Sequence, residues 1–591
     1  MIVSKRKSEE NVESKKFKKI KSENSQPYGK RNSEVRKFDK SGQKNATLDK
    51  PPNWNEFKKQ KKELKIKRKQ TKTLYDVSVK AKQISEKLRK KNLEGGKEER
   101  DKLVIELHKM LGGKNNYVKF VLSHDMGRVV QYLLKFGRQD IRDDIAKELI
   151  PSTVLLIQSI YGKFCIKTLL KYGNTQIRTD ILRACYGHAV KLASHSVSAH
   201  VFEFAYRTYG HPREKNHLIQ EFFGDIYKKS KDDSIKHIRD VYEKSPDLKK
   251  AALDCTKANL QRVLNKKLLD SNLVQTVLSQ YLSECSENDR SELLTQLAPH
   301  SVVLSNSKDG ARVVMMIIWL GTNKDRKVAM KSLKEHILDL CKHETGHTTI
   351  IALLDAVDDT VLLNKTILSD ILKNLLELAK DEWGRKVLLW LINPGCSKYF
   401  HPTFMNELQK GRENSTCKKP VETRREEIWN YSVTHFMDSI ENEAEKWLEN
   451  TSMASIVANV IGKGNQNKTV LENISKIITN HEWKINDDED KSILGIEHSG
   501  LQMVIKTMIL NDSKLIGTES GLFSRILCDH INPEMLEIWL KLNRGCFTLI
   551  AMLEKGPKDV QDKLKSILSS YIDLLGKQKN VGAQILLKKL Q

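Results

Sequence analysis

The sequence has 591 residues, with 102 Lys and Arg against 75 Asp and Glu for a net charge of +27, and 39% of its residues are hydrophobic. Its longest strongly apolar run, Val313 to Leu320, is too short to cross a bilayer, and the N-terminus MIVSKRKSEE lacks the apolar core of a signal peptide. We therefore expect neither a secreted nor a membrane-spanning protein, and we expect an acidic partner.

The first part of the chain holds most of the charge. Residues 1–100 contain 32 Lys and Arg and 14 Asp and Glu, or +18. Residues 1–70 lack apolar periodicity for most of their length and predict a disordered basic tail. Two basic clusters stand in it about ten residues apart: Lys5, Arg6 and Lys7, then Lys15, Lys16, Lys18, Lys19 and Lys21. Their spacing predicts a nuclear import signal or a tail that condenses on phosphates; the alternative is a solubilising tail.

A second basic block, KQKKELKIKRK, begins at Lys59 and lacks Pro and Gly. It predicts a basic helix with few apolar anchors, which is not stable alone. Binding to a polyanion explains such a helix.

From about residue 100 onward the pattern is helical, and one stretch recurs in it. The stretch has a small or charged pair, two apolar residues, two variable residues and two mostly apolar ones. GRVVQYLL, KFCIKTLL and AHVFEFAY begin 36 residues apart, and ARVVMMII, HTTIIALL and RKVLLWLI follow at spacings of 36 and 38. The eleven copies begin at Gly127, Lys163, Ala199, Gln275, Ala311, His347, Arg385, Ala454, Gln502, Cys546 and Ala583.

A helical repeat of 36 residues cannot bury its apolar face alone, so the units must stack. The sequence predicts an all-α solenoid of about eleven units in two arms. Three units fill 71–213, an insertion covers 214–250, and about eight units fill 251–591. The apolar pairs of each stretch are expected in the core: Val129, Val130, Ile166, Val313, Val314, Val387 and Leu388. The first, second and fifth residues share the opposite helix face and are the candidates for function.

These residues carry a resemblance. A repeat of 36 residues with a five-residue stretch ending in Gln131, GRVVQ, resembles the pumilio (PUF) repeat, in which the first and fifth residues bond a base edge and the second stacks between bases. WNEFKKQKKELK from Trp54, KDGARVV and WLGTNKDRK across 308–327, and EWGRKVLLWLINP across 382–394 resemble its divergent nucleolar branch, the Puf-A group with a CPL-type C-terminal region. The resemblance covers about residue 51 to the end.

The resemblance implies an L-shaped solenoid that binds RNA and DNA with little base preference. It also implies assembly of the large ribosomal subunit in the nucleolus, and, for some members, translational repression of bound messages. The implied partners are ribosomal precursor RNA, messenger RNA, DNA and pre-ribosomal proteins, with no membrane. We expect a monomer in the nucleus and nucleolus.

The sequence departs from the base-reading pattern of the family. Gln131 and Glu203 are the only candidate base readers in the first three units, and apolar Met315, Ile351 and Leu389 hold the fifth place later. We therefore predict contact mainly with the nucleic-acid backbone, from Arg128, Lys163, Lys167, Arg312, Arg385 and Lys386. Phe164 and His200 are the candidate stacking residues. For any one of these basic residues, the alternative is an ordinary solvated surface charge. Because such residues recur on one helix face, contact with nucleic acid is favoured for the set.

A zinc-protease pattern, H-E-x-x-H, occurs at His343, Glu344 and His347. Its chemistry needs both histidines one turn apart on a helix. The repeat spacing places Gly346 at a helix start, so the two histidines are expected to straddle that start. We predict no metal site, no cofactor and no enzyme activity. The nine cysteines form no C-x-x-C pair and predict reduced thiols.

Two classes of function remain. The leading prediction is a non-catalytic nucleic-acid-binding scaffold. The alternative is a nuclear protein–protein adaptor, because other helical solenoids share this design. The basic N-terminal region favours the scaffold, since an adaptor does not need a charge of +18 there.

Overall fold

The computed structural model describes residues 58–59, 62–63, 75–90, 93, 95–112, 116–243, 245–463, 468–486, 491–515 and 521–591. The chain divides into two units, Met1–Tyr75 and Asp76–Gln591. The predicted import signal lies outside the described residues: Lys5, Arg6, Lys7, Lys15, Lys16, Lys18 and Lys19. In the first unit the structure describes only 58–59, 62–63 and Tyr75, where the two short pieces are helical.

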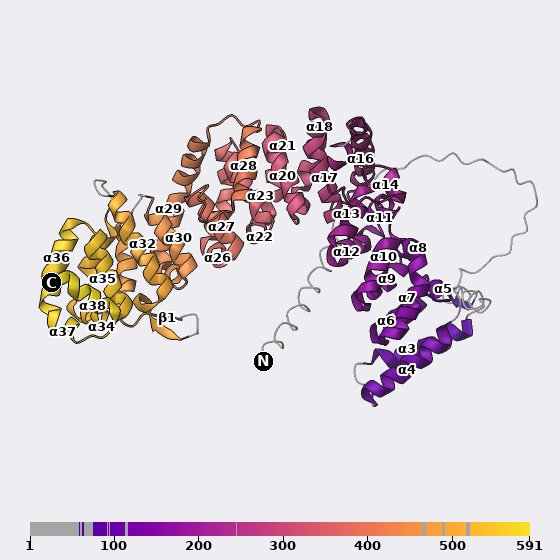
Figure 1. Ribbon diagram of the computed structural model, residues 1–591, viewed down its shortest axis with the longest axis horizontal. Helices are drawn as coiled ribbons and strands as arrows, with labels where there is room; N and C mark the ends of the chain where they lie inside the picture. The colour runs from indigo at the N-terminus through magenta and orange to yellow at the C-terminus, as the bar shows by residue number, and fades with distance from the viewer. Residues whose placement is uncertain are drawn as a thin grey trace, which may run out of the picture. The chain divides into compact units, whose positions relative to one another are not determined.

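The second unit is a stack of helices in which each predicted copy of the repeat forms one helix (Figure 1). We call these the face helices: α6 (His124–Phe136), α9 (Gly162–Tyr172), α12 (Ala199–Tyr209), α17 (Asn272–Glu284), α20 (Lys308–Leu320), α23 (Gly346–Ala356), α27 (Glu382–Ile392), α30 (Thr451–Ile461), α32 (Ser499–Leu515), α35 (Asn543–Lys555) and α38 (Val581–Leu590). Each packs against the next in chain order. In the described part of the chain, the predicted eleven-unit α-solenoid is confirmed.

The apolar pairs of the repeat form the core, as predicted. Val130, Ile166, Val313 and Val387 have no exposed surface, and Val129 is 2% exposed. A fully buried aliphatic side chain contributes about 1.5–3 kcal/mol of transfer free energy. Neighbouring units share this buried layer, so the stability of each unit depends on its neighbours.

Glycine at the start of a face helix permits close packing on the helix before it. A Cβ at Gly384 would lie 2.5 Å from the carbonyl oxygen of Leu378, six residues earlier. A Cβ at Gly545 would lie 2.5 Å from the corresponding oxygen of Trp539. Any larger residue would force the two helices of a unit apart, which explains the recurring glycine in the sequence.

Arginines cap the C-terminal ends of several face helices, each from the helix that follows the face helix in the chain. Arg142 of α7 (Gln139–Leu149) donates to the carbonyl of Leu134 at 2.9 Å, and Arg178 of α10 (Thr175–Ala184) donates to that of Leu170 at 2.9 Å. Arg290 of α18 (Glu287–Leu297) and Arg326 of α21 (Asn323–Leu333) repeat the contact. These guanidinium groups satisfy carbonyls that lack a partner in the helix and oppose the negative end of its dipole. They are structural cations.

Short helices fill the predicted insertion at 214–250. They are α13 (Pro212–Gln220), α14 (Ile226–Lys229) and α15 (Asp240–Glu243), followed by α16 (Leu248–Leu264). The buried carboxylate of Glu221 accepts hydrogen bonds from the backbone N–H of Gly187 at 2.7 Å and of Ala189 at 2.8 Å, and it pairs with Lys231. These contacts tie the segment to the third unit. The boundaries of the insertion and of the two arms stay a prediction.

A second departure from the regular spacing separates α27 from α30. It contains α28 (Pro402–Glu413) and the long α29 (Val421–Leu448). Further on, β1 (Lys484–Asn486) and β2 (Ser492–Leu494) form an antiparallel hairpin in which Ile485 lies opposite Ile493. Among the described residues, no helix has the length and apolar character needed to span a membrane.

The other helices of the described chain connect these elements. They are α3 (Tyr75–Arg89), α4 (Gly96–Leu111), α5 (Asn116–Val121), α8 (Thr153–Gln158), α11 (Ala189–Ala193), α19 (Ser301–Leu304), α22 (Ile337–Cys341), α24 (Thr360–Leu363), α25 (Ser369–Lys373), α26 (Leu375–Lys380), α31 (Lys468–Ile478), α33 (Phe523–His530), α34 (Pro533–Lys541), α36 (Lys558–Leu568) and α37 (Ile572–Gly576).

Candidate nucleic-acid interface

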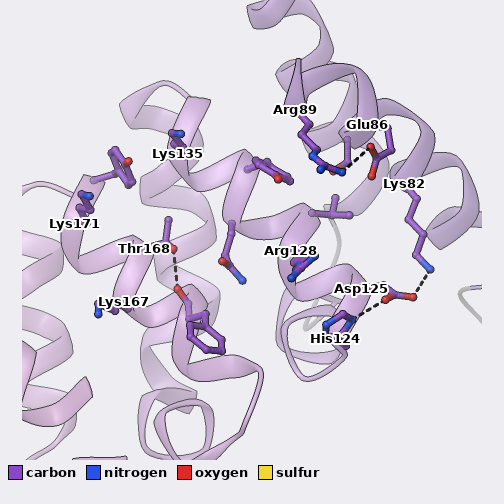
Figure 2. Close-up of a pocket in the computed structure, with 16 residues that line it drawn as sticks. Lys82, Glu86, Arg89, His124, Asp125, Arg128, Lys135, Lys167, Thr168 and Lys171 are labelled. Carbon is purple, nitrogen blue, oxygen red and sulfur yellow. Dashed lines mark hydrogen bonds and ion pairs between the residues drawn. The ribbon is translucent and has the colours of Figure 1, made fainter. Parts of the chain in front are cut away.

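An open groove of about 780 Å³ lies between α3 and the exposed faces of α6 and α9 (Figure 2). Helix α3 contributes Lys82, Ser85, Glu86 and Arg89. The other side is lined from α6 and α9 by His124, Asp125, Arg128, Val129, Gln131, Tyr132, Lys135, Phe164, Lys167, Thr168, Lys171 and Tyr172. Four of the residues predicted from the sequence, Arg128, Gln131, Phe164 and Lys167, therefore meet in one groove.

Cations dominate the lining of the groove. Its two carboxylates are already paired: Asp125 lies 2.8 Å from Lys82, and Glu86 lies 3.4 Å from Arg89 (Figure 2). Four further cations line the groove and are exposed: Arg128, Lys135, Lys167 and Lys171. Within the described part of the chain these four form no ion pair. The groove thus presents positive charge that the protein itself does not neutralise.

Aromatic rings lie beside the cations of this surface. The ammonium of Lys167 stands 4.9 Å from the ring centre of Phe204 on α12. Lys135 stands 4.9 Å from Phe136, and Lys171 stands 5.7 Å from Tyr172. Attraction between a cation and a ring holds each side chain near one position without neutralising its charge.

A third row of residues lies on this surface, outside the repeat positions from which contacts were predicted. Lys135 and Lys171 occupy equivalent places in the last turns of α6 and α9, and Arg207 holds the same place, also exposed, on α12. We call these three residues the cationic edge. In the sequence, a basic residue directly follows each of the first three eight-residue stretches, so the signal lies one position beyond the repeat pattern. The next four units have Ser283, Trp319, Asp355 and Asn393 there.

The two candidate base readers differ in their surroundings. Gln131 is half-buried and its Nε2 donates to the carbonyl of Gly127 at 3.2 Å. Glu203 accepts hydrogen bonds from the hydroxyl of Ser271 at 2.7 Å and from the backbone N–H of Asn272 at 2.9 Å, at the start of α17. Burial raises the pKa of the Glu203 carboxyl. Glu203 thus caps α17, and its role as a base reader is not supported by this geometry.

The remaining residues predicted in the first three units are on the same surface. Lys163 is half-buried, and its ammonium stands 5.2 Å from the ring centre of Phe164. The ring of Phe164 is 48% exposed, so it does not pack fully against its neighbours. His200 is exposed at the start of α12.

Helix α28 covers the faces of α20 and α23, and α20 carries the predicted contact residue Arg312. The Nε of Arg312 donates to Glu407 of α28 at 2.8 Å, and its Nη1 lies 3.2 Å from Asp309. The backbone of α28 lies against the ring of Trp319 at Gly411, where no Cβ would fit. Arg312 is therefore engaged within the protein, in contrast to Arg128.

The two cations predicted on α27 differ in their contacts. Arg385 donates to the carbonyls of Ala379 and Lys380, each at 3.2 Å. Lys386 stands 4.0 Å from the ring centre of Trp383. Arg312 and Arg385 therefore have hydrogen-bond partners within the protein, whereas Lys386 is half-buried beside a ring in the same way as Lys163.

The H-E-x-x-H residues lie as the repeat spacing predicted. Helix α23 begins at Gly346, so His343 precedes the helix and His347 is in its first turn. The Nδ1 of His343 accepts from the backbone N–H of Gly346 at 3.2 Å. His347 is buried and stacks on Trp383 with ring centres 4.9 Å apart. In the described residues, no cluster of three metal-ligating side chains occurs.

Comparison with known proteins agrees with this architecture. A model of the CPL (NUC119) domain matches residues 380–521, from the end of α26 past the β-hairpin. Pumilio homolog 3 of Rattus norvegicus is 31% identical over 94% of this chain and 86% of its own length. The chain belongs to the Pumilio homolog 3 (Puf-A) family. Protein penguin of Drosophila melanogaster, 30% identical over 91% of this chain and 84% of its own length, is another relative.

Solved structures of the Puf-A family share the fold. Human Puf-A superimposes with a TM-score of 0.80 at 28% identity, over 87% of this chain and all of the human structure. Human Puf-A in complex with DNA gives a TM-score of 0.79 at 28% identity, over 88% of this chain and all of the human structure. The predicted family and fold class are confirmed.

Proposed function

We propose that this protein is a non-catalytic scaffold that binds RNA, and also DNA, mainly through the nucleic-acid backbone. The observation that carries the proposal is the set of unneutralised cations on α6 and α9, Arg128, Lys135, Lys167 and Lys171. Phosphate oxygens are the complementary ligands for a row of exposed ammonium and guanidinium groups. The human relative crystallised with DNA supports the proposed class of partner.

Low sequence preference follows from the same residues. A base edge is recognised by polar side chains that are free to form directed hydrogen bonds. Of the two candidate base readers on the first three units, Glu203 is engaged by α17, and Gln131 is half-buried and donates to the carbonyl of Gly127. Lysine and arginine contacts to phosphate carry no direct sequence information.

The proposed cellular role is assembly of the large ribosomal subunit in the nucleolus, on ribosomal precursor RNA, with translational repression of bound messages as a further role. The basic clusters of residues 1–70 and the family resemblance support nuclear and nucleolar localisation. Crosslinking RNA to the protein in cells, followed by sequencing, tests this role. A majority of ribosomal precursor reads is expected; absence of crosslinked RNA would favour the adaptor alternative.

Binding in solution tests the biochemical proposal. Labelled RNA and single-stranded DNA of several unrelated sequences should bind with similar affinities that fall steeply with salt. Changing Arg128, Lys163 and Lys167 together to Ala should weaken all of them by a similar factor. Gln131→Ala serves as the matched single change on the same face and should alter relative affinities little. A large preference for one short RNA that disappears in Gln131→Ala would contradict backbone-led binding.

A further inference from the structure

Helix α28 lies against α20 and α23 (Figure 1), and a pocket remains at its N-terminal end. The pocket has a volume of about 350 Å³, and its walls come from α20, α23, α27, residues 399–401 and the first turns of α28. Its lining includes aromatic and apolar side chains from each of these elements: Met315, His347, Trp383, Tyr399, Phe400 and Phe404. A concave site of this size, with an apolar lining and a few polar groups, is typical of ligand pockets in proteins.

Contacts with neighbouring side chains hold two rings of the pocket in place. The ring of Phe400 meets that of Trp390 edge to face, with centres 5.1 Å apart. The hydroxyl of Tyr399 accepts a hydrogen bond of 2.9 Å from the side-chain amide of Asn459 on α30. The pocket is therefore formed before a ligand arrives, and binding does not have to order these two side chains.

His347 supplies a hydrogen-bond acceptor to this pocket. Its Nδ1 donates to the carbonyl of His343 at 3.2 Å, so Nε2 carries the lone pair of the neutral ring. Burial lowers the pKa of His347 to about 4, which keeps the ring neutral at pH 7. His347 is 6% exposed and lines the pocket. A buried acceptor favours an occupant that carries an N–H or O–H donor, because an unmet acceptor costs free energy.

The charged groups of the lining favour an occupant with negative charge beside it. Glu407 is neutralised by Arg312. Lys308 is exposed and Lys386 is half-buried, and neither forms an ion pair within the described part of the chain. Against these two lysines stands one carboxylate of the lining, Glu344, that forms no ion pair among the described residues. The excess positive charge attracts carboxylates to the edge of the pocket.

We propose that this pocket binds one tryptophan or tyrosine side chain of a partner protein, from a segment that carries aspartate or glutamate next to the ring. The ring fills the apolar part of the pocket, its N–H or O–H donates to Nε2 of His347, and the neighbouring carboxylates meet Lys308 and Lys386. Tryptophan and tyrosine are enriched among the side chains that anchor protein interfaces in such pockets. Such a partner goes beyond the proposed function and does not depend on nucleic-acid binding by the groove.

A protein side chain is favoured over a nucleic-acid base as the occupant. Among the described residues, the repeat positions that carry free cations on α6 and α9 do not carry them on α20 and α23. Arg312 is paired with Glu407, and the positions that correspond to the cationic edge hold Trp319, which is 6% exposed, and the buried Asp355. A strand that placed a base in this pocket would therefore lack the phosphate contacts that the groove provides.

Peptides displayed on phage test this proposal. Random nine-residue peptides are selected on immobilised full-length protein in the presence of saturating single-stranded RNA, which occupies the groove. Enriched peptides are then synthesised with a fluorescent label and titrated. We expect enrichment of peptides that carry Trp or Tyr next to Asp or Glu. Replacing that ring by Ala in the peptide should weaken binding by roughly 30-fold or more, as for a side chain that anchors an interface.

Variants of the pocket separate its contributions. His347→Phe keeps a ring against Trp383 but removes the acceptor, and it should weaken binding of the selected peptide by roughly 2- to 12-fold. Lys386→Gln should lower the salt dependence of peptide binding. The matched control is His435→Phe, because His435 also bonds the carbonyl four residues earlier, at 3.2 Å, and lies against an aromatic ring, that of Tyr431. This control should leave peptide binding unchanged.

Photo-crosslinking to the wild-type protein gives a readout that does not depend on the folding of a variant. The selected peptide, with p-benzoylphenylalanine in place of its ring, should crosslink to Met315 or within residues 399–407. A selection without enriched peptides would overturn the proposal, as would peptides that bind wild type and His347→Phe equally and crosslink elsewhere. Crosslinks from RNA containing 5-iodouracil to residues 399–407 would also overturn it, and would assign the pocket to a base.

Discussion

The guanidinium of Arg312 on α20 donates a hydrogen bond of 2.8 Å to the carboxylate of Glu407 on α28. Arg412 of the same helix pairs with Asp355 of α23 at 2.8 Å. In the repeat, Arg312 holds the position that Arg128 holds in the first unit, and Asp355 holds the position of Lys135. On α20 and α23, helix α28 therefore covers repeat positions whose counterparts in the first unit line the open groove. The segment between α27 and α29 therefore occupies the faces of α20 and α23.

The two ion pairs of α28 should differ in their contribution to stability. The carboxylate of Asp355 is fully buried, and without Arg412 its remaining cation among the described residues is Arg425 at 3.6 Å. Arg412→Ala should therefore destabilise the fold by about 3 kcal/mol, since it leaves a buried charge poorly compensated. Glu407→Ala removes a half-exposed pair and should cost about 1 kcal/mol or less.

Hydrogen exchange of residues 402–413 and thermal melting measure both effects. Arg412→Ala should accelerate exchange across α28 more than Glu407→Ala does, and neither should change affinity for RNA more than about twofold. Equal effects of the two variants, or a strong loss of RNA binding in Glu407→Ala, would contradict this account of α28.

The cationic edge should contribute phosphate contacts that the sequence pattern alone did not reveal. Changing Lys135, Lys171 and Arg207 to Gln should lower the slope of log affinity against log salt by about two to three, close to one for each lost contact. The matched control replaces Lys102, Lys109 and Lys191, which are exposed on α4 and α11, with Gln and so removes the same total charge. If both triple variants lower the slope equally, the effect comes from net charge and the edge has no special role.

His347 should make the fold sensitive to acid. Burial lowers the pKa of His347 to about 4, from an ordinary 6.5. Between these values the unfolded chain binds a proton that the folded chain does not, so stability falls as pH falls from 6.5 and the loss is complete below about 4. The full effect is about 3 kcal/mol.

The substitution His347→Phe keeps a flat ring against Trp383 and removes the titration. Melting temperatures between pH 7 and pH 4.5 should fall less in this variant than in wild type. The control His200→Phe changes an exposed histidine on α12 and should leave the pH dependence as in wild type. An unchanged dependence in His347→Phe would show that other groups control acid stability.

The repeat spacing predicted the fold well because one physical requirement, burial of Val130, Ile166 and their equivalents between stacked units, fixes both the sequence pattern and the structure. The site was predictable only where it follows the same repeat. Arg128 and Lys167 lie in the groove, but the pairing of Arg312 with Glu407 of α28 depends on a segment about ninety-five residues later in the chain. No local pattern reveals that Glu407 returns to Arg312, or that Glu203 caps α17.

The N-terminal region should direct the protein within the cell. Deleting residues 1–70 removes both basic clusters and the block KQKKELKIKRK. A fluorescent fusion of the shortened protein should move from the nucleolus into the nucleoplasm or cytoplasm. Replacing the same lysines and arginines with Gln in the full-length protein is the matched control for length, and it should give the same redistribution. Unchanged nucleolar enrichment in both would place the targeting information elsewhere.

Hydrogen exchange of the full-length protein with and without saturating single-stranded RNA tests the central claim most directly. Binding through the groove should slow exchange at residues 124–136, 162–172 and 199–209, on α6, α9 and α12. Residues 308–320 and 346–356, under α28, should exchange equally in both states. Protection concentrated on α20 and α23, with none on the first three units, would contradict the claim that this protein binds nucleic acid through the basic groove.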